Sequence, residues 1–300
     1  MATVDTTTRL PADVTTADRA AGRGRRRMPR AGWYTICALV AVMMLFPLVM
    51  LVLTSVKTPA EAAASPPTYL PSRISFQNFA DLSANSGGLI RYVLNSVLVA
   101  LGTVFGVVVL ATLGGYGFAR YEFPGRNVLF IVILSTLMIP FQAILTPLFL
   151  VLAKVNLTNS LIGLTLVYIT FQLPFALFLM RNSFSQVPQA LEDAARLDGA
   201  GTMTALFRVM MPIVRPGIIT TALFAFFASW NEFLAALILL SDQTKFTLPV
   251  LLTTLQTGQL GTLNWGILEA GVVVTMIPCI IIFLLLQRYY VKGMTAGAVK

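Results

Sequence analysis

Residues 33–55 read WYTICALVAVMMLFPLVMLVLTS, an apolar run of 23 residues without a charged side chain. A helix of this length extends about 35 Å, because each residue adds about 1.5 Å, and the hydrocarbon core of a bilayer is roughly 30 Å thick. A basic stretch, RGRRRMPR at 23–30, precedes the run, as it would in a secretory signal peptide. The run is longer than the apolar part of a signal peptide, so we interpret it as an uncleaved first transmembrane helix.

The composition of the whole chain is that of a membrane protein. Of its 300 residues, 57% are hydrophobic and only 11% are charged, and the mean hydropathy is +0.81. A soluble domain carries about 25% charged residues, so much of this chain must face lipid. The sequence therefore predicts an all-α integral membrane protein with six transmembrane helices, of which five follow the first at Tyr92–Phe118, Val128–Val151, Leu161–Met180, Ile218–Leu240 and Ile267–Gln287.

The basic residues predict the orientation of these helices. If the N-terminus is cytoplasmic, 16 of the 21 Lys and Arg residues fall in cytoplasmic segments and 5 fall outside. Such an asymmetry is typical of the cytoplasmic side of a membrane protein. We expect a multi-pass protein of the cytoplasmic membrane with both termini inside. Residues 1–32 would be a disordered basic tail, 33–290 the membrane domain and 291–300 a C-terminal tail. Topology explains the net charge of +9, so no nucleic-acid partner is expected.

A polar loop, residues 181–215, lies between the fourth and fifth predicted spans. Its central part, at 191–212, reads LEDAARLDGAGTMTALFRVMMP. Good helix formers come first, and Gly199 supplies the left-handed residue that ends a helix. Thr202 can cap a second helix that runs to Pro212. The sequence therefore predicts a helix–turn–helix at the inner face of the membrane.

Two interpretations of this loop follow from physical chemistry alone. Its helices could pack on the membrane surface, or they could dock a soluble partner. Ala194 and Ala195 would let another backbone approach closely, and the neighbouring carboxylates of Glu192 and Asp193 would give that contact an ionic anchor. Loops of this length are often functional, but these arguments leave both interpretations open.

The loop also resembles a known pattern. The cytoplasmic loop of ATP-binding-cassette importer permeases has E-A-A, three residues, G, nine residues, then I-x-L-P. The spacing is the same here, with Asp in place of Glu, Val in place of Ile and Met in place of Leu, at Asp193, Ala194, Ala195, Gly199 and Val209–Pro212. Asp193 is one methylene shorter than Glu, so both Glu192 and Asp193 are candidates for the anchoring carboxylate.

Four further segments carry the same resemblance. They are GYGFARYEFPGRN at 115–127, LPFALFLMRNSF at 173–184, SWNEFLAALILL at 229–240 and QRYYVKGMTAGAVK at 287–300. Several segments in the right order are more specific than one motif. The chain most resembles the second permease subunit of carbohydrate importers of the maltose and glycerol-phosphate type.

The resemblance implies a mechanism and a set of partners. The loop would be a coupling helix seated in a cytoplasmic ATPase. The partners would be a homologous second permease, two ATPase subunits, an extracytoplasmic binding protein, membrane lipid and a sugar or sugar derivative. ATP and Mg²⁺ would bind the ATPases, since this chain lacks the G-x-x-x-x-G-K-[ST] phosphate loop. The coupling residues on this chain would be Glu192, Asp193, Ala194, Ala195, Gly199 and Pro212.

Polar residues inside the predicted spans are candidates for the substrate path. Glu232 is the only acidic residue well inside a span, and an ionised carboxylate there costs about 3 kcal/mol on insertion scales. Asn231 and Glu232 could equally hydrogen-bond a neighbouring helix or the partner permease. Trp230 could stack on a sugar ring or simply pack. Gln142 and Gln172 lie beside prolines, which suggests the wall of a cavity.

Two glycines predict a close approach of helices. Gly102 and Gly106 form a G-x-x-x-G in the second span, where small residues let helices pack tightly. The same pattern also occurs by chance in apolar spans.

The residue inventory argues against an enzyme. The chain has no histidine, which excludes a His-ligated metal or a His base, and its two cysteines, Cys37 and Cys279, lie in apolar runs. We therefore expect no catalytic, cofactor-binding or metal-binding residues. The alternatives to sugar import are import of a polyol or glycerol-phosphate-type solute, a membrane enzyme and a non-transporting scaffold.

Overall fold

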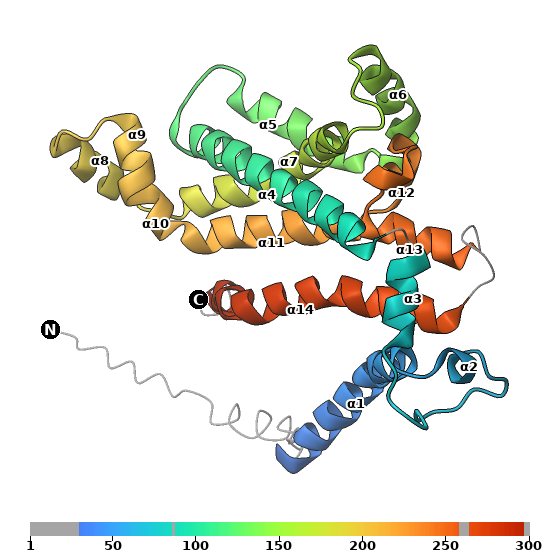
Figure 1. Cartoon of the computed structure of the whole chain (residues 1–300). Coiled ribbons are helices and arrows are strands. Elements are labelled where there is room, and N and C mark those ends of the chain that lie inside the picture. The colour runs from blue at the N-terminus through green and yellow to red at the C-terminus, as the bar shows by residue number, and fades with distance from the viewer. Residues whose placement is uncertain (1–29, 86–87, 258–263, 297–300) are drawn as a thin grey trace, which may run out of the picture. The chain divides into compact units, whose positions relative to one another are not determined.

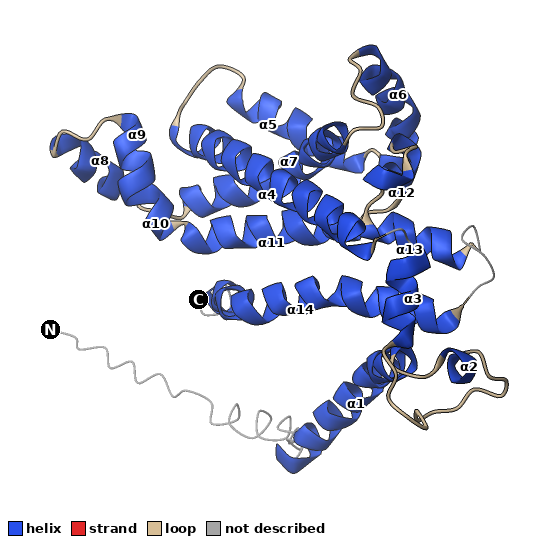
Figure 2. Cartoon of the chain, in the orientation of Figure 1, coloured by secondary structure: helices blue, strands red, loops and turns tan. Residues whose placement is uncertain are grey.

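The structure is a computed structural model that describes residues 30–85, 88–257 and 264–296. Every regular element in these ranges is a helix, as the prediction of an all-α protein requires (Figure 2). The chain divides into two compact units, residues 1–49 and 50–300.

The predicted N-terminal tail falls outside this description up to residue 29, and the predicted C-terminal tail, 291–300, only in its last four residues, because α14 continues to Ala296. Residues 1–29 of the N-terminal tail and residues 297–300 of the C-terminal tail lie outside the described residues. The boundaries predicted for the tails therefore stay predictions.

The helices follow one another along the chain as Figure 1 shows. The α-helices before the loop are α1 (Arg30–Ser55), α2 (Pro59–Ala62), α3 (Gln77–Asn85), α4 (Leu89–Arg120), α5 (Arg126–Ser135), α6 (Phe141–Lys154) and α7 (Leu161–Ser185). Those within and after it are α8 (Gln189–Leu197), α9 (Thr202–Thr204), α10 (Met211–Ile213), α11 (Arg215–Asn231), α12 (Leu234–Leu239), α13 (Leu248–Gln256) and α14 (Trp265–Ala296). Two short 3-10 helices, η1 (Thr136–Met138) and η3 (Gln243–Lys245), and one π-helical stretch, η2 (Ala205–Met210), complete the set.

The described residues contain four helices that are long and apolar enough to cross a membrane, at Ala31–Ser55, Leu89–Arg120, Leu161–Ser185 and Trp265–Gln287. Two further pairs of helices pass the same test together but are strongly bent. The number of spans reaches six if each bent pair is one span, so the predicted count of six stays a prediction.

The prediction of one continuous helix at Val128–Val151 is wrong. The helical segment Arg126–Met138 and the helix Phe141–Lys154 meet at 104°. The break falls at Pro140, whose ring cannot continue the preceding helix, and Ile139 before it adopts extended angles (φ −82°, ψ 121°). The bend leaves an apolar hollow of about 830 Å³ between these helices and their neighbours α4 and α7.

The prediction of a continuous helix at Ile218–Leu240 is also wrong. Helix α11 ends at Asn231, Glu232 is extended (φ −74°, ψ 130°), and α12 begins at Leu234. The chain thus breaks its helix inside a predicted span, at the acidic residue that the sequence singled out.

The close approach predicted from the G-x-x-x-G pattern is confirmed. Helix α4 packs along α7, and both contact α11 (Figure 1). A Cβ added at Gly106 would collide with the side chain of Ile169, and one added at Gly115 would lie 2.6 Å from Cβ of Met180. A row of small residues on α4, which includes Gly102, therefore lets the two backbones lie close together.

The polar loop is a helix–turn–helix at one end of these helices (Figure 1). Its first helix is α8, and its second runs through α9, η2 and α10 without a gap. The second helix is tied to the membrane helices by apolar packing, since Leu206 and Met210 are buried in one cluster with Met180 and Phe184 of α7. The prediction that Thr202 caps this helix is wrong, because Thr202 is already helical and Gly201 precedes it without a side-chain cap.

Candidate functional site

Helix α8 has one exposed and one buried face. Asp193 and Ala194 are exposed, and Leu197 is 89% exposed, while Glu192 and Ala195 are buried. The exposed face therefore combines a carboxylate, a small residue and one apolar side chain. Of the four predicted coupling residues on α8, the exposed face thus carries Asp193 and Ala194, while Glu192 and Ala195 face inward.

Glu192 lies at the centre of a buried polar cluster. Its Oε1 accepts a hydrogen bond from the Tyr116 hydroxyl at 2.6 Å and pairs with Arg196 Nη2 at 2.8 Å. Its Oε2 lies 3.3 Å from Arg120 Nε, with the Arg120 and Glu192 side chains only 8% and 3% exposed. The carboxylate is thereby paired with two positive charges and one hydroxyl donor, from α4 and from its own helix, which a buried charge needs.

The cluster separates the roles of the two candidate carboxylates. Glu192 is turned inward toward Tyr116 and Arg120, whereas Asp193 is exposed. The Glu192 carboxylate raises the pKa of the Arg196 guanidinium, chiefly through their opposite charges. Of the two, Asp193 is therefore the carboxylate that a partner could reach on this conformation of the loop.

The turn after α8 depends on Gly199. Its φ is +84°, which confirms the predicted left-handed residue. The Gly199 N–H donates to the Arg196 carbonyl and the Ala200 N–H to the Ala195 carbonyl, both at 3.0 Å. These are the two bonds of a Schellman ending, in which the residue with positive φ is usually glycine. No atom lies within 4 Å of a Cβ added there, so the backbone angle alone requires glycine.

Pro212 explains the π-helical stretch. It lies in the first turn of α10, directly after η2. A proline lacks an N–H and its ring clashes with the carbonyl four residues earlier, here that of Arg208, so the preceding turn widens. The predicted coupling residue thus shapes the second helix of the loop.

The second candidate region surrounds the break at Glu232. The Tyr168 hydroxyl donates to Glu232 Oε2 at 2.6 Å. The Ala235 N–H donates to Oε1 at 3.0 Å, and the Ala236 N–H lies 3.4 Å from Oε2. The carboxylate therefore caps the start of α12 and joins it to α7, which offsets the cost of placing a charge there.

A cavity of about 200 Å³ lies beside this carboxylate. The structure brings Gln172 and Glu232 together in its wall, as two of the residues predicted for the substrate path, with five others: Phe141, Tyr168, Phe171, Ala228 and Ser229. The mixture of aromatic rings and a few polar groups is typical of a ligand site.

The structure separates the other three predicted path residues from this cavity. Trp230 is 1% exposed, its indole N–H donates to the Thr275 carbonyl at 3.1 Å, and its ring stacks on Phe226. This is the packing alternative, so Trp230 is not available to a solute in this conformation. Asn231 is exposed and donates to the Phe227 carbonyl of its own helix. Gln142 is also exposed.

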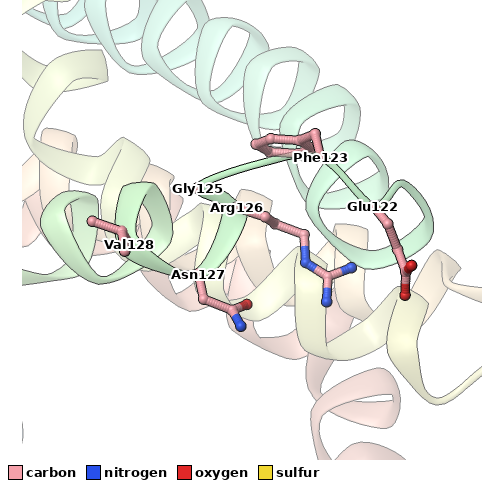
Figure 3. Close-up of a pocket in the computed structure, with 6 residues that line it drawn as sticks. All are labelled: Glu122, Phe123, Gly125, Arg126, Asn127 and Val128. Carbon is pink, nitrogen blue, oxygen red and sulfur yellow. The ribbon is translucent and has the colours of Figure 1, made fainter.

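The turn from α4 to α5 forms an open hollow of about 290 Å³. Figure 3 shows its lining, Glu122, Phe123, Gly125, Arg126, Asn127 and Val128, of which all but Val128 belong to the segment 115–127 that carried part of the resemblance. Arg126 Nη1 donates to the Tyr121 carbonyl at 3.1 Å and thereby closes the turn. The hollow is shallow and its polar groups are not buried, so we assign no ligand to it.

Comparison with known proteins decides which family this architecture represents. Residues 108–296 match the family described as binding-protein-dependent transport system inner membrane component. The chain belongs to this family. Its members are transport permeases, so the family match confirms the expectation of a permease with several membrane helices.

Similar permeases are known from several bacteria. The chain is 34% identical over 281 residues to the diacetylchitobiose uptake system permease protein NgcG of Streptomyces coelicolor, covering 93% of this chain and 91% of that one. It is 36% identical over 232 residues to the trehalose transport system permease protein SugB of Mycobacterium tuberculosis, covering 77% and 84%. A bacterial ABC transporter for alginate import contains a chain of the same fold, with a TM-score of 0.74 at 23% identity, covering 86% of this chain and 94% of that one.

Three polar residues of this permease were missed as site residues by sequence reasoning. Arg120 was counted only for topology, and Tyr116 and Tyr168 were not considered. No local signal could have paired them with Glu192 and Glu232, because each partner lies on another helix. A tyrosine hydroxyl near a buried carboxylate is recognisable only once the helices are packed.

Proposed function

We propose that this chain is one permease subunit of an ATP-binding-cassette importer and forms part of the path of a sugar or sugar derivative across the cytoplasmic membrane. The family match supports the transport role, and two relatives named for diacetylchitobiose and trehalose support a carbohydrate cargo. A homologous second permease, two ATPase subunits that bind ATP and Mg²⁺, and an extracytoplasmic binding protein would complete the machine.

The observation that carries the proposal is the exposed face of α8. The helix holds Asp193, Ala194 and Leu197 in the open on a turn fixed by Gly199. An exposed carboxylate beside small and apolar side chains suits a cleft on a soluble protein better than it suits lipid. We infer that an ATPase subunit binds there and that both termini lie on the same, cytoplasmic side.

The polar cavity at the α11–α12 break is our candidate for part of the path. Gln172, Ser229 and Glu232 offer hydrogen-bonding groups next to the rings of Phe141 and Phe171. Sugars are bound by such combinations of polar groups and apolar ring faces. A cavity this small would hold part of a sugar, with the remaining contacts supplied by the second permease.

The proposal is tested by purifying the tagged chain from its native membrane in mild detergent with everything that remains bound. ATP hydrolysis is then measured with and without the binding protein and a panel of diacetylchitobiose, trehalose, arabino-oligosaccharides and glycerol 3-phosphate. We expect hydrolysis that one carbohydrate stimulates. Stimulation by glycerol 3-phosphate alone would change the cargo class, and an intact chain that brings down no ATPase would overturn the importer.

A further inference from the structure

One arginine spans the junction between a membrane helix and the exposed loop helix. Arg120 is the last residue of α4, and its Nη2 donates to the Val187 carbonyl at 2.7 Å. Its Nε lies 3.3 Å from Glu192 Oε2. Val187 comes just before α8 and Glu192 lies in its first turn, so a single guanidinium holds both sides of the start of α8.

The geometry of the guanidinium makes this contact directional. Arginine presents several N–H donors in a rigid plane, and here two of its nitrogens contact different groups of the loop. Tyr116 lies one turn earlier on α4 and donates to the same Glu192 carboxylate at 2.6 Å. Helix α4 therefore contacts α8 through two side chains on one face, spaced as residues i and i+4.

The second attachment of the loop is of another kind. Helix η2 is held through Leu206 and Met210, which pack among apolar residues of α7 such as Phe184. Apolar contacts are non-directional, so they fix the relative orientation of two helices less specifically than a charged, hydrogen-bonded pair does. In the described part of the chain, Glu192 takes part in both ion pairs, one with Arg120 and one with Arg196. Of these two arginines, only Arg120 belongs to a membrane helix, so this ion pair alone connects α8 with α4.

We propose that Arg120 is a positioning residue that, with Tyr116 and Glu192, makes α8 and the C-terminal end of α4 move as one body. Displacement of α8 by a bound partner is then passed to α4 and, through the close α4–α7 contact, to the helices that surround the polar cavity. The inference rests on the proposed importer function and adds to it the route by which the loop acts on the membrane helices.

The functional test compares uptake with ATP hydrolysis in the reconstituted complex. Arg120→Gln and Glu192→Gln each remove one charge of the pair, and Arg120→Lys keeps the charge but loses the planar fork. We expect Arg120→Gln to lower the number of solute molecules imported per ATP about tenfold, within the usual range of coupling between two sites, and Arg120→Lys to lower it less. Glu192→Gln should lower the ratio as well, because it removes the charge that Arg120 faces.

The matched control is Arg126→Gln. Arg126 lies six positions further along the chain and contacts only a carbonyl of its own turn. We expect the import-to-hydrolysis ratio of this variant to equal that of the wild type. An equal fall in Arg126→Gln and Arg120→Gln would overturn the proposal, because a general effect of lost positive charge would then explain both.

The structural test needs no substrate. Spin labels are placed at the exposed Leu113 of α4 and the exposed Asp198 after α8, in a chain whose Cys37 and Cys279 are replaced by serine. We expect one narrow distance distribution in the wild type, unchanged between nucleotide-free and vanadate-trapped complexes, and a broader distribution in Arg120→Gln.

The outcomes separate the two proposals. If the wild-type complex lacks ATP hydrolysis, the importer function falls, while the distance distribution of the solubilised chain still tests the contact. If hydrolysis and uptake are normal and Arg120→Gln leaves both the import ratio and the distribution unchanged, the role of Arg120 is overturned. If Arg120→Gln fails to insert, Glu192→Gln decides, and an import ratio and a distance distribution that both equal those of the wild type would contradict the proposal.

Discussion

Two carboxylates, the buried Glu192 and the half-buried Glu232, are satisfied in the same way at opposite ends of the described helices. Glu192 lies in the first turn of α8 and Glu232 lies two residues before the first residue of α12, where the helix dipole favours a negative charge. Each accepts a hydrogen bond of 2.6 Å from a tyrosine hydroxyl, of Tyr116 or Tyr168, that belongs to a neighbouring membrane helix. In both places a carboxylate joins a short helix to a long one.

Substitution of Glu232 tests this role at the α11–α12 break. Glu232→Ala removes a helix cap, worth about 1 kcal/mol, and a hydrogen bond to a charged group, worth about 1.5–3 kcal/mol. We expect the thermal unfolding temperature of the complex in detergent to fall by several degrees. Asn231→Ala is the matched control: Asn231 is exposed and uncharged, donates to the Phe227 carbonyl of its own helix and bonds the Cys279 thiol, so its loss should lower the temperature less than loss of Glu232 does. Equal unfolding temperatures for both variants would contradict the structural role.

The turn at Gly199 gives a second prediction for a single residue. A side chain at φ +84° costs about 1–2 kcal/mol, and more for a β-branched residue. We expect Gly199→Val to lose most uptake while the chain still inserts, and Gly199→Asn to keep more activity because asparagine tolerates this conformation. Uptake and membrane content are measured together. Gly201→Ser is the control, since Gly201 has a negative φ and open space around it. Full uptake by Gly199→Val would refute the requirement.

The sequence predicts local conformations well and tertiary pairings poorly. Gly199 was predictable because a helix that ends in glycine is a local pattern, and its φ confirms it. The contacts of Glu192 with Arg120 and of Glu232 with Tyr168 join residues far apart in the chain. Their sequence signal is an acidic residue where none is expected, and this indicates only that a partner or a cavity exists. For Trp230 the sequence allowed either stacking on a sugar ring or packing against other helices. Only its burial in the structure shows that it packs.

At the level of elements, the α4–α7 contact depends on glycines that differ in what surrounds them. A Cβ added at Gly115 would lie 2.6 Å from Met180 Cβ and 2.9 Å from backbone atoms of α7. A Cβ added at Gly117 would have no atom within 4 Å. Both glycines belong to α4, so they form a matched pair.

We expect Gly115→Ala to destabilise the protein by about 1–3 kcal/mol, the usual cost of overpacking, because backbone atoms of α7 must move. Gly117→Ala should be neutral or stabilise by up to about 1 kcal/mol, since alanine is the better helix former. Thermal unfolding of the purified complex measures both. A Gly115→Ala variant as stable as Gly117→Ala would show that the helices are not in close contact at this point.

The two broken helices show what hydropathy cannot detect. A hydropathy window averages over the residues of a span, so Val128–Val151 and Ile218–Leu240 look as continuous as the other runs. A proline does not by itself signal a broken helix either, because Pro147 and Pro174 lie inside α6 and α7, while Pro140 lies between two helical segments that meet at 104°. What differs is the surrounding structure: neighbouring helices decide whether a proline bends a helix slightly or ends it.

At the level of the whole molecule, the proposed function requires the loop and the N-terminus to lie on the same side of the membrane. The distribution of basic residues predicts this side to be cytoplasmic. Two exposed residues report on the two sides: Asp198, at the end of α8, and Arg73, in the segment before α3. Neither is part of the buried clusters, so a cysteine at either place should leave the fold intact.

We expect a membrane-impermeant maleimide to label Arg73→Cys in intact cells, and Asp198→Cys only after the cells are permeabilised, in a chain whose Cys37 and Cys279 are replaced by serine. The reason is that α8 must face the compartment that holds ATP if an ATPase binds it, whereas Arg73 must face the side from which a binding protein delivers the solute. The reverse labelling pattern would place Asp193 and Gly199 outside the cell, where no ATPase could reach them, and the proposed coupling through α8 and Arg120 would then fall together with the orientation.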